Sequence, residues 1–324
     1  MKNKVESSIM KAMDGKLLDK QDIVNLLELP SQSQEVKLLG ALARSISKSV
    51  ADNRGKIWAA IGLDYASCKM NCSFCSLGEE WNSTRKYYEL EEDEVMKITE
   101  AFIENGVNWL VIRTTEFYDF DKLIYYARKI KNILPEDVVF TVNTGDDNSR
   151  RSKELKDAGF DMVYQTIRLR EGVDTDFSID DRKETLGKIT DSGMILSQYL
   201  EPIGPEHTSE EIAERILAIV EEKTTVAGVM KRVSIEGTPK FEFGDLDEDR
   251  LAHIVAVMRI ATRGHIEDII IHPYSKKALD CGANAIVVDI GAIPRSPKME
   301  LKEWNSIDAE KAKMLLVDSG YYVQ

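Results

Sequence analysis

Three of the four cysteines in this chain lie within eight consecutive positions. They are Cys68, Cys72 and Cys75, and their spacing is C-x3-C-x2-C. Cysteine thiolates are strong ligands for zinc and for the irons of iron–sulfur clusters. The spacing of these residues therefore predicts a metal centre rather than disulfides.

Two kinds of metal centre use thiolates that are close in sequence, and they differ in the number of protein ligands. A structural zinc site is a closed set of four ligands. The other donors in this chain are Cys281 and four histidines, which lie far along the sequence without paired spacing. An iron–sulfur cubane bound by three thiolates keeps one iron open for chemistry. The sequence favours this cluster over zinc, and over three buried cysteines that bind no metal.

The segments around the motif alternate between apolar strands and amphipathic helices. Residues 56–65 are expected to form a strand directly before Cys68, and residues 91–107 a helix. Further strands, with helices between them, are expected at 109–115, 138–145, 161–169, 195–202, 229–235, 268–274 and 285–291.

This alternation predicts an α/β fold, a TIM-like (β/α)8 barrel with an N-terminal helical extension. Strands that alternate with helices pair in parallel through crossover connections, and about eight units close a barrel. The absence of a G-x-G-x-x-G turn disfavours an open dinucleotide-binding sheet. We expect residues 1–50 to be the helical extension, 51–298 the barrel, and 299–324 a tail that packs on it. The cysteines then lie on the rim that carries active sites in such barrels.

The charge and the apolar content of the chain argue against nucleic acid and membranes as binding partners. The net charge of −13, without basic clusters, argues against nucleic acid as a partner. No stretch approaches the roughly 18 apolar residues of a membrane span, and the N-terminal stretch lacks the apolar segment of a signal peptide. We therefore expect a cytoplasmic protein with reduced cysteines.

The cysteine motif in the first loop of a barrel resembles that of the radical S-adenosylmethionine superfamily, where an aromatic residue such as Phe74 precedes the third cysteine. The resemblance implies a [4Fe-4S] cluster on Cys68, Cys72 and Cys75, with S-adenosyl-L-methionine on the open iron. It also implies reductive cleavage of S-adenosylmethionine to a 5′-deoxyadenosyl radical. This radical is expected to abstract hydrogen from, or add to, a small, amino-acid-like substrate, which is then rearranged or fragmented. An electron donor such as flavodoxin or ferredoxin is the expected partner.

From about residue 20 to residue 297, the layout resembles the branch that contains biotin synthase, the hydrogenase diiron-site maturase and methylornithine synthase. In this branch a polar turn after the second strand meets the methionyl amino group, and residues 112–116 stand at that place. Thr114 and Thr115 occupy positions where glycine or serine–glycine is usual. The resemblance places these residues at S-adenosylmethionine: Phe74, Thr114, Thr115, Glu116, Asn143, Glu171, Arg182 and Gly204.

Four of these assignments come with a physical reason or an alternative. Alternation allows either Arg170 or Glu171 to face the interior, and we favour Glu171. Arg182 is expected to clamp the methionyl carboxylate, since a guanidinium can bind a planar carboxylate through two hydrogen bonds. Gly204 permits close backbone approach near the adenine, and Asn143 is expected to touch ribose or substrate.

Polar residues on or at the ends of predicted strands are candidates for substrate contacts. A polar group that is buried without a partner costs about 1–3 kcal/mol, so such groups are expected to bind a ligand. The candidates are Arg113, Gln165, Gln198, Arg232 and His272.

Two alternative functions follow from the same motif. Sulfur insertion of the biotin or lipoyl synthase kind needs a second cluster as donor, and Cys281 is the one cysteine outside the motif. A partner subunit would then have to supply the donor cluster. The alternative from another class is a noncatalytic iron–sulfur protein.

Overall fold

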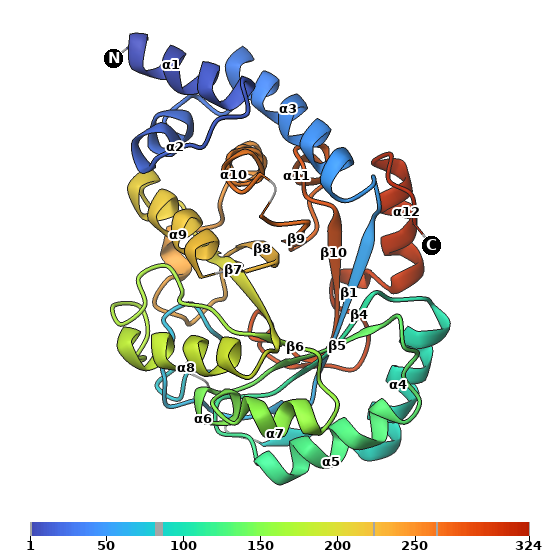
Figure 1. Cartoon of the computed structure of the whole chain (residues 1–324). Coiled ribbons are helices and arrows are strands. Elements are labelled where there is room, and N and C mark those ends of the chain that lie inside the picture. The colour runs from blue at the N-terminus through green and yellow to red at the C-terminus, as the bar shows by residue number, and fades with distance from the viewer. Residues whose placement is uncertain (1, 82–86, 223, 264, 324) are drawn as a thin grey trace.

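The computed structural model describes residues 2–81, 87–222, 224–263 and 265–323. Within these residues, eight parallel strands form a closed barrel in which the first strand pairs with the last (Figure 1). The strands are β1 (Lys56–Gly62), β4 (Trp109–Arg113), β5 (Val139–Asn143), β6 (Met162–Tyr164), β7 (Ile195–Ile203), β8 (Val226–Lys231), β9 (Asp268–His272) and β10 (Ala285–Ala292). The predicted (β/α)8 barrel is confirmed.

Helices follow the strands and surround the barrel (Figure 1). They are α4 (Glu92–Glu104), α5 (Phe120–Lys131), α6 (Asp146–Ser149), α7 (Ser152–Asp157), α8 (Ile179–Asp191), α9 (Ser209–Glu221), α10 (Glu248–Ala261) and α11 (Lys276–Asp280). Asp119, Ser178 and Thr208 begin three of them, and each side chain accepts a hydrogen bond from a backbone N–H of the first turn. A bilayer-spanning helix is not found among the described residues, since none of their helices has the necessary length and apolar character.

Three helices precede the barrel: α1 (Lys2–Met13), α2 (Lys20–Leu27) and α3 (Gln34–Val50). Helix α3 packs along α10, and α2 lies beside α9 (Figure 1). Every residue of α10 from Leu251 to Ile260 is buried. A helix that is buried on all sides needs cover on its outer face, and α3 supplies it.

Short elements complete the rim and the end of the chain. β2 (Asp64–Tyr65) pairs with β3 (Tyr88–Glu89) after β1, and η1 (Phe241–Phe243) follows β8. β11 (Met299–Glu300) pairs antiparallel with β10 and is followed by η2 (Trp304–Ser306) and α12 (Ala309–Asp318). Helix α12 packs against β1 and β10 (Figure 1).

Side chains of the strands alternate between two apolar layers. In β1, Ile57, Ala59 and Ile61 join the layer between barrel and helices, whereas Trp58 and Ala60 join the barrel interior. The interior layer contains four aromatic rings, which we call the aromatic floor: Trp58, Trp109, Tyr164 and Tyr199. The ring centroid of Trp58 lies 5.8 Å from that of Trp109 and 5.9 Å from that of Tyr199. The floor fills the barrel beneath a cavity at the carboxyl ends of the strands.

Candidate active site

The cysteine loop follows β1 and is held by backbone hydrogen bonds to three other segments of the rim. The Ser73 N–H donates to the carbonyl of Asp174 at 2.8 Å, and the Ser73 carbonyl accepts from Lys240 N–H at 3.0 Å. The Ser76 N–H donates to the carbonyl of Pro294 at 3.0 Å. The loop is therefore positioned by residues that are distant in sequence.

Cys68, Cys72 and Cys75 are free thiols that line the same cavity. Burial raises the pKa of all three thiols, that of Cys68 to about 12, so without a metal the thiols stay protonated. Metal ligation uses the thiolate form, and a bound cation would displace these protons.

The distances between the three sulfur atoms bear on whether these thiols could all bind one metal ion. Thiolates on a single zinc ion lie about 3.8 Å apart, as follows from the Zn–S distance and tetrahedral geometry. Within the described part of the chain, the one group of three such ligand atoms lying within 4.8 Å of one another does not involve these cysteines. The three thiols are therefore not arranged as the ligands of a single zinc ion in this structure.

Most of the residues that the sequence placed at the site line this one cavity. They lie at the carboxyl ends of, or directly after, β1, β4, β5, β6, β8 and β9, except for one arginine on α8. The carboxyl ends of parallel strands meet at one end of a barrel, which brings these residues together. They are Cys68, Cys72, Phe74, Cys75, Arg113, Thr114, Thr115, Glu116, Asn143, Gln165, Arg182, Arg232 and His272.

The prediction that Gln198 contacts the substrate is wrong, because its side chain lies outside the barrel interior. Its amide donates to Thr224 Oγ1 at 2.7 Å, and its carbonyl oxygen accepts a hydrogen bond from Arg215 of α9. Side chains of a strand alternate in direction, so the next residue, Tyr199, faces the cavity instead.

Gly204 and Glu171 also lie away from the cavity surface. A Cβ atom at Gly204 would overlap the side-chain ends of Arg232 and Glu206, so any other residue here would force this ion pair to shift. Glu171 is buried behind the cavity wall, where its carboxylate accepts from the Arg168 N–H at 2.9 Å and from Thr175 at 2.7 Å. The alternative residue, Arg170, pairs with Glu211 at 2.6 Å.

Arg182 is held rigidly but keeps unused hydrogen-bond donors. Its side chain is 1% exposed, donates to Asp146 at 2.9 Å and stacks 3.7 Å above the ring of Phe177. Its Nε and Nη2 atoms are buried without a hydrogen-bond partner. Nε lies 3.6 Å from the Glu171 carboxylate, so Nη2 is the donor that a carboxylate in the cavity would satisfy.

The turn after β4 is held by its own neighbours. The Thr115 N–H donates to Asp64 Oδ1 at 2.8 Å, and the Thr114 N–H donates to the carbonyl of Asn143 at 2.9 Å. Glu116 accepts a hydrogen bond from the Asp146 N–H at 2.7 Å. Burial raises the pKa of Glu116 to about 7, so this carboxyl can hold or release a proton near neutral pH.

Five charged residues of the cavity were not predicted as site residues: Arg168, Glu201, Lys231, Asp289 and Arg295. Arg168 lies 3.6 Å from the carboxylates of both Glu171 and Glu201. Asp289 lies in the middle of β10 and faces inward, where it meets three basic side chains. A lone acidic residue within the apolar run AIVVDIGA is the sequence signal that could have revealed it.

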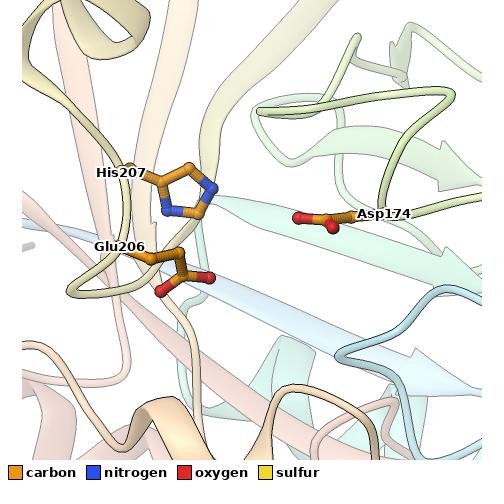
Figure 2. A group of neighbouring side chains, drawn as sticks. All are labelled: Asp174, Glu206 and His207. Carbon is orange, nitrogen blue, oxygen red and sulfur yellow. The ribbon is translucent and has the colours of Figure 1, made fainter.

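A separate cluster of Asp174, Glu206 and His207 lies at the rim, and Figure 2 shows their side chains turned toward one another. Lys240 lies 2.9 Å from Asp174, and Arg232 pairs with Glu206, so the two carboxylates already have cationic partners. His207 Nδ1 accepts from the Gly204 N–H at 2.9 Å, which places the proton of the neutral ring on Nε2. The cluster is therefore an ion-pair network that links rim segments.

Comparison with known sequences identifies relatives of this chain. The model of one protein family, described as the Radical SAM superfamily, matches residues 64–232, just over half of the chain. A biotin synthase from Hyphomonas neptunium is 26% identical over 214 residues, which cover 62% of this chain and 65% of that protein. A biotin synthase from Ehrlichia canis is 24% identical over 225 residues, covering 65% of this chain and 67% of the relative. The chain thus aligns with about two thirds of the length of these relatives.

Comparison with solved structures extends the likeness of fold to nearly the whole chain. The crystal structure of methylornithine synthase matches with a TM-score of 0.81 and 17% identity, over 98% of this chain and 97% of that one. HydG from Carboxydothermus hydrogenoformans, a maturase of the FeFe-hydrogenase, matches with a TM-score of 0.80 and 15% identity, over 100% of this chain and 80% of that one. At these identities the likeness concerns the fold.

Proposed function

The chain belongs to the radical SAM superfamily and is therefore an enzyme that uses an iron–sulfur cluster and S-adenosylmethionine; from this premise we propose that Cys68, Cys72 and Cys75 hold a [4Fe-4S] cluster. The observation that carries the proposal is that three free thiols of one loop line one cavity at the carboxyl ends of the barrel strands. Three thiolates leave one iron of a cubane open, and S-adenosylmethionine would bind there. When bound, these groups supply one-electron cleavage of a carbon–sulfur bond, and with it the ability to remove hydrogen from an unactivated carbon.

The residues around the cysteines would bind S-adenosylmethionine. Arg182 would offer Nη2, which has no hydrogen-bond partner, to the methionyl carboxylate, while its Nε faces Glu171 at 3.6 Å. Glu116 and the turn of Thr114 and Thr115 would hold the amino group, and Asn143 would contact the ribose. Phe74 lines the cavity next to the third cysteine and limits access of water.

Two further residues would act from behind or beside the cavity wall. Glu171 lies 3.6 Å from both Arg182 and Arg168 and would keep these two guanidinium groups in place. Gly204 allows Arg232 and Glu206 to pack closely at the rim. These residues would position the groups that bind the ligands.

The substrate would occupy the rest of the cavity, above the aromatic floor. Arg113, Gln165, Arg232 and His272 line this part together with Tyr199. Such a mixture of charged and aromatic groups suits a small, amino-acid-like molecule, which the enzyme would rearrange or fragment. Closely packed rings beneath it exclude water from the reacting atoms.

Sulfur insertion is less well supported than a single-cluster reaction. Within the described residues, no cysteine besides the three of the loop lines the cavity. Cys281 lies at the end of α11, where its sulfur packs against Gly40 of α3. A sulfur-insertion enzyme would need its donor cluster from another subunit.

The enzyme would need an electron donor, for which a small protein such as flavodoxin or ferredoxin is suited. Three free thiols next to one another fit a reducing compartment such as the cytoplasm. We therefore propose that the protein works there.

The proposal predicts an iron content and a reaction that depend on Cys72 and not on Cys281. Anaerobically reconstituted protein should hold about four iron atoms per chain and release 5′-deoxyadenosine from S-adenosylmethionine under reducing conditions. Cys72→Ala should abolish that release, because the cluster would lose one of its three ligands.

Cys281→Ala is the matched control, since it removes a thiol of the same chain away from the cavity, and it should keep the iron content. Tightly bound zinc in the wild-type protein, or cleavage that persists in Cys72→Ala, would contradict the assignment. Iron near eight atoms per chain would instead favour the sulfur-insertion alternative.

A further inference from the structure

Asp289 is the centre of a buried charged group at the β9–β10 side of the cavity. Its Oδ1 accepts from Arg113 Nη1 at 2.7 Å, and its Oδ2 lies 3.0 Å from Arg295 Nη2 and from His272 Nε2. The Asp289 side chain is 0% exposed, and those of Arg113 and Arg295 are 11% and 14% exposed. One carboxylate thus faces two guanidinium groups and one imidazole.

This group carries one unbalanced positive charge. Burial and the neighbouring Arg295 lower the pKa of His272 to about 4, so its ring is neutral near pH 7. Arg113 and Arg295 are always charged, whereas Asp289, with its pKa held below its usual range by these neighbours despite its burial, supplies one negative charge. Buried charge without a counter-charge is unfavourable in a protein interior.

The unused hydrogen-bond donors of this group belong to Arg295. Arg113 also donates through Nε to the carbonyl of Ala292 at 3.2 Å, so it is well satisfied. Arg295 has one bond to Asp289, while its Nη1 meets only the thioether sulfur of Met230 at 3.1 Å, a weak acceptor. Its Nε is buried without a partner.

The other cationic side chains around the cavity have their own carboxylates. Arg232 pairs with Glu206 and donates to the carbonyl of Gly244 at 2.9 Å. Lys231 pairs with Glu248 at 2.5 Å. Arg168 and Arg182 lie among three acidic groups: Glu171, Glu201 and Asp146. Among the described cavity residues, the charge excess is therefore found at Arg295.

We propose that Arg295 binds a carboxylate of the substrate through Nη1, whose one hydrogen-bond contact among the described residues is the thioether sulfur of Met230. A hydrogen bond from a charged guanidinium to a carboxylate is roughly twice as strong as one between neutral groups. A single excess charge matches a monoanion rather than a phosphate dianion. The inference deepens the proposed function and rests on it, since it assigns the substrate, and not S-adenosylmethionine, to this side of the cavity.

The test compares matched small ligands on reconstituted protein with saturating S-adenosylmethionine, which occupies the site at Arg182. The probes are acetate, propionate and butyrate, each paired with its uncharged amide, and inorganic phosphate. Affinities follow from the ligand-dependent shift of the thermal midpoint. We expect at least one carboxylate to bind about 10-fold or more tightly than its amide, as charge-assisted hydrogen bonds imply.

Arg295→Gln should remove this preference. Arg151→Gln, which removes the same charge from a surface arginine paired with Glu154, should keep it. Arg295→Lys keeps the charge but replaces the planar guanidinium by a flexible ammonium group, and it should show a reduced preference even if Arg295→Gln folds poorly. Release of 5′-deoxyadenosine is measured in parallel, so that failure of the proposed function is seen separately from failure of carboxylate binding.

Several outcomes would overturn the inference. They are equal affinity for carboxylate and amide in the wild type, a preference that survives in Arg295→Gln, and stronger binding of phosphate than of every carboxylate. Arg295 also lies near enough to Cys75 for its charge to offset part of the rise that burial causes in the pKa of that thiol. An altered electron paramagnetic resonance spectrum of the cluster in Arg295→Gln, with carboxylate preference intact, would assign Arg295 to the cluster instead.

Discussion

Gly204 shows how one residue can be necessary for the arrangement of the site without touching the cavity. The side chains of Arg232 and Glu206 pack against its backbone in the space that a Cβ atom would fill. Glu206 in turn lies 3.7 Å from Lys240, whose backbone N–H holds the cysteine loop at Ser73. The absence of a side chain at this position therefore supports contacts of three rim segments.

Gly204→Ala is expected to destabilise the protein by about 1–3 kcal/mol, the usual cost of inserting atoms into packed structure. Gly187→Ala is the matched control, because a Cβ atom at Gly187, within helix α8, would meet nothing within 4 Å. Alanine there should stabilise the helix by about 0.5–1 kcal/mol. Urea unfolding of both variants measures the difference, and equal midpoints would show that the Arg232–Glu206 pair moves aside freely.

At the scale of single elements, the strand pattern determines which side chains reach the cavity. In β7, Tyr199 faces the interior and the adjacent Gln198 faces α9. Burial is complete on both faces of this strand, since Gln198 is 0% exposed and Tyr199 is 1% exposed. Hydrophobic alternation is therefore weak in such strands, and sequence alone does not reveal their direction.

Helix α10 contains a buried histidine that makes stability depend on pH. His253 Nε2 lies 2.9 Å from the carbonyl of Leu26 in α2, and Arg250 lies 3.4 Å from its Nδ1. Burial and the Arg250 charge lower the pKa of His253 to about 4, below the value of about 6.5 in an unfolded chain. At pH values between these two pKa values, the His253 ring binds more protons in the unfolded state than in the native state. The stability that the neutral ring contributes is therefore lost as the pH falls through this range.

Between pH 7 and pH 5, the unfolding free energy of the wild-type protein should therefore fall by about 2 kcal/mol more than that of His253→Gln. Denaturant unfolding at the two pH values measures this difference. His265→Gln, which removes an exposed histidine, is the control and should behave as the wild type does. An equal pH dependence in His253→Gln and the wild type would refute the assignment.

At the scale of the whole molecule, the N-terminal helices and the barrel share one hydrophobic core. Leu26, Leu39 and Ala43 belong to the same buried cluster as Val255 and Met258 of α10. The boundary near residue 50 therefore marks a change of architecture along the chain, whereas the packing is continuous across it.

We predict that removal of residues 1–50 exposes the apolar outer face of α10 and yields a barrel that aggregates or unfolds without cooperativity. Removal of residues 1–14 takes away α1 alone and leaves α3 in place, so this shorter deletion should remain folded. Soluble yield and thermal unfolding measure both variants. A cooperative transition of the longer deletion at the wild-type temperature would show that the barrel is independent of its extension.

The order of the elements and the place of the cysteine loop could be predicted from sequence, because both depend on local patterns. Apolar runs, helical periodicity and capping residues are read within about 15 residues of chain. Parallel topology then brings strand ends together, which explains why most of the predicted residues share one cavity. The side-chain directions of Gln198 and Glu171 depend instead on packing that leaves no mark in the pattern.

The sequence by itself determined the barrel, the three-thiolate loop and the end of the barrel where chemistry occurs, since each is a property of short segments and their order. Only the tertiary structure decided which charges neutralise each other. Asp289 accepts a hydrogen bond from Arg113, which is 176 positions away in sequence, whereas Nε of Arg295 has no hydrogen-bond partner. The balance of charge inside a cavity depends on which side chains meet across strands and loops remote in sequence, and that is a property of the folded chain alone.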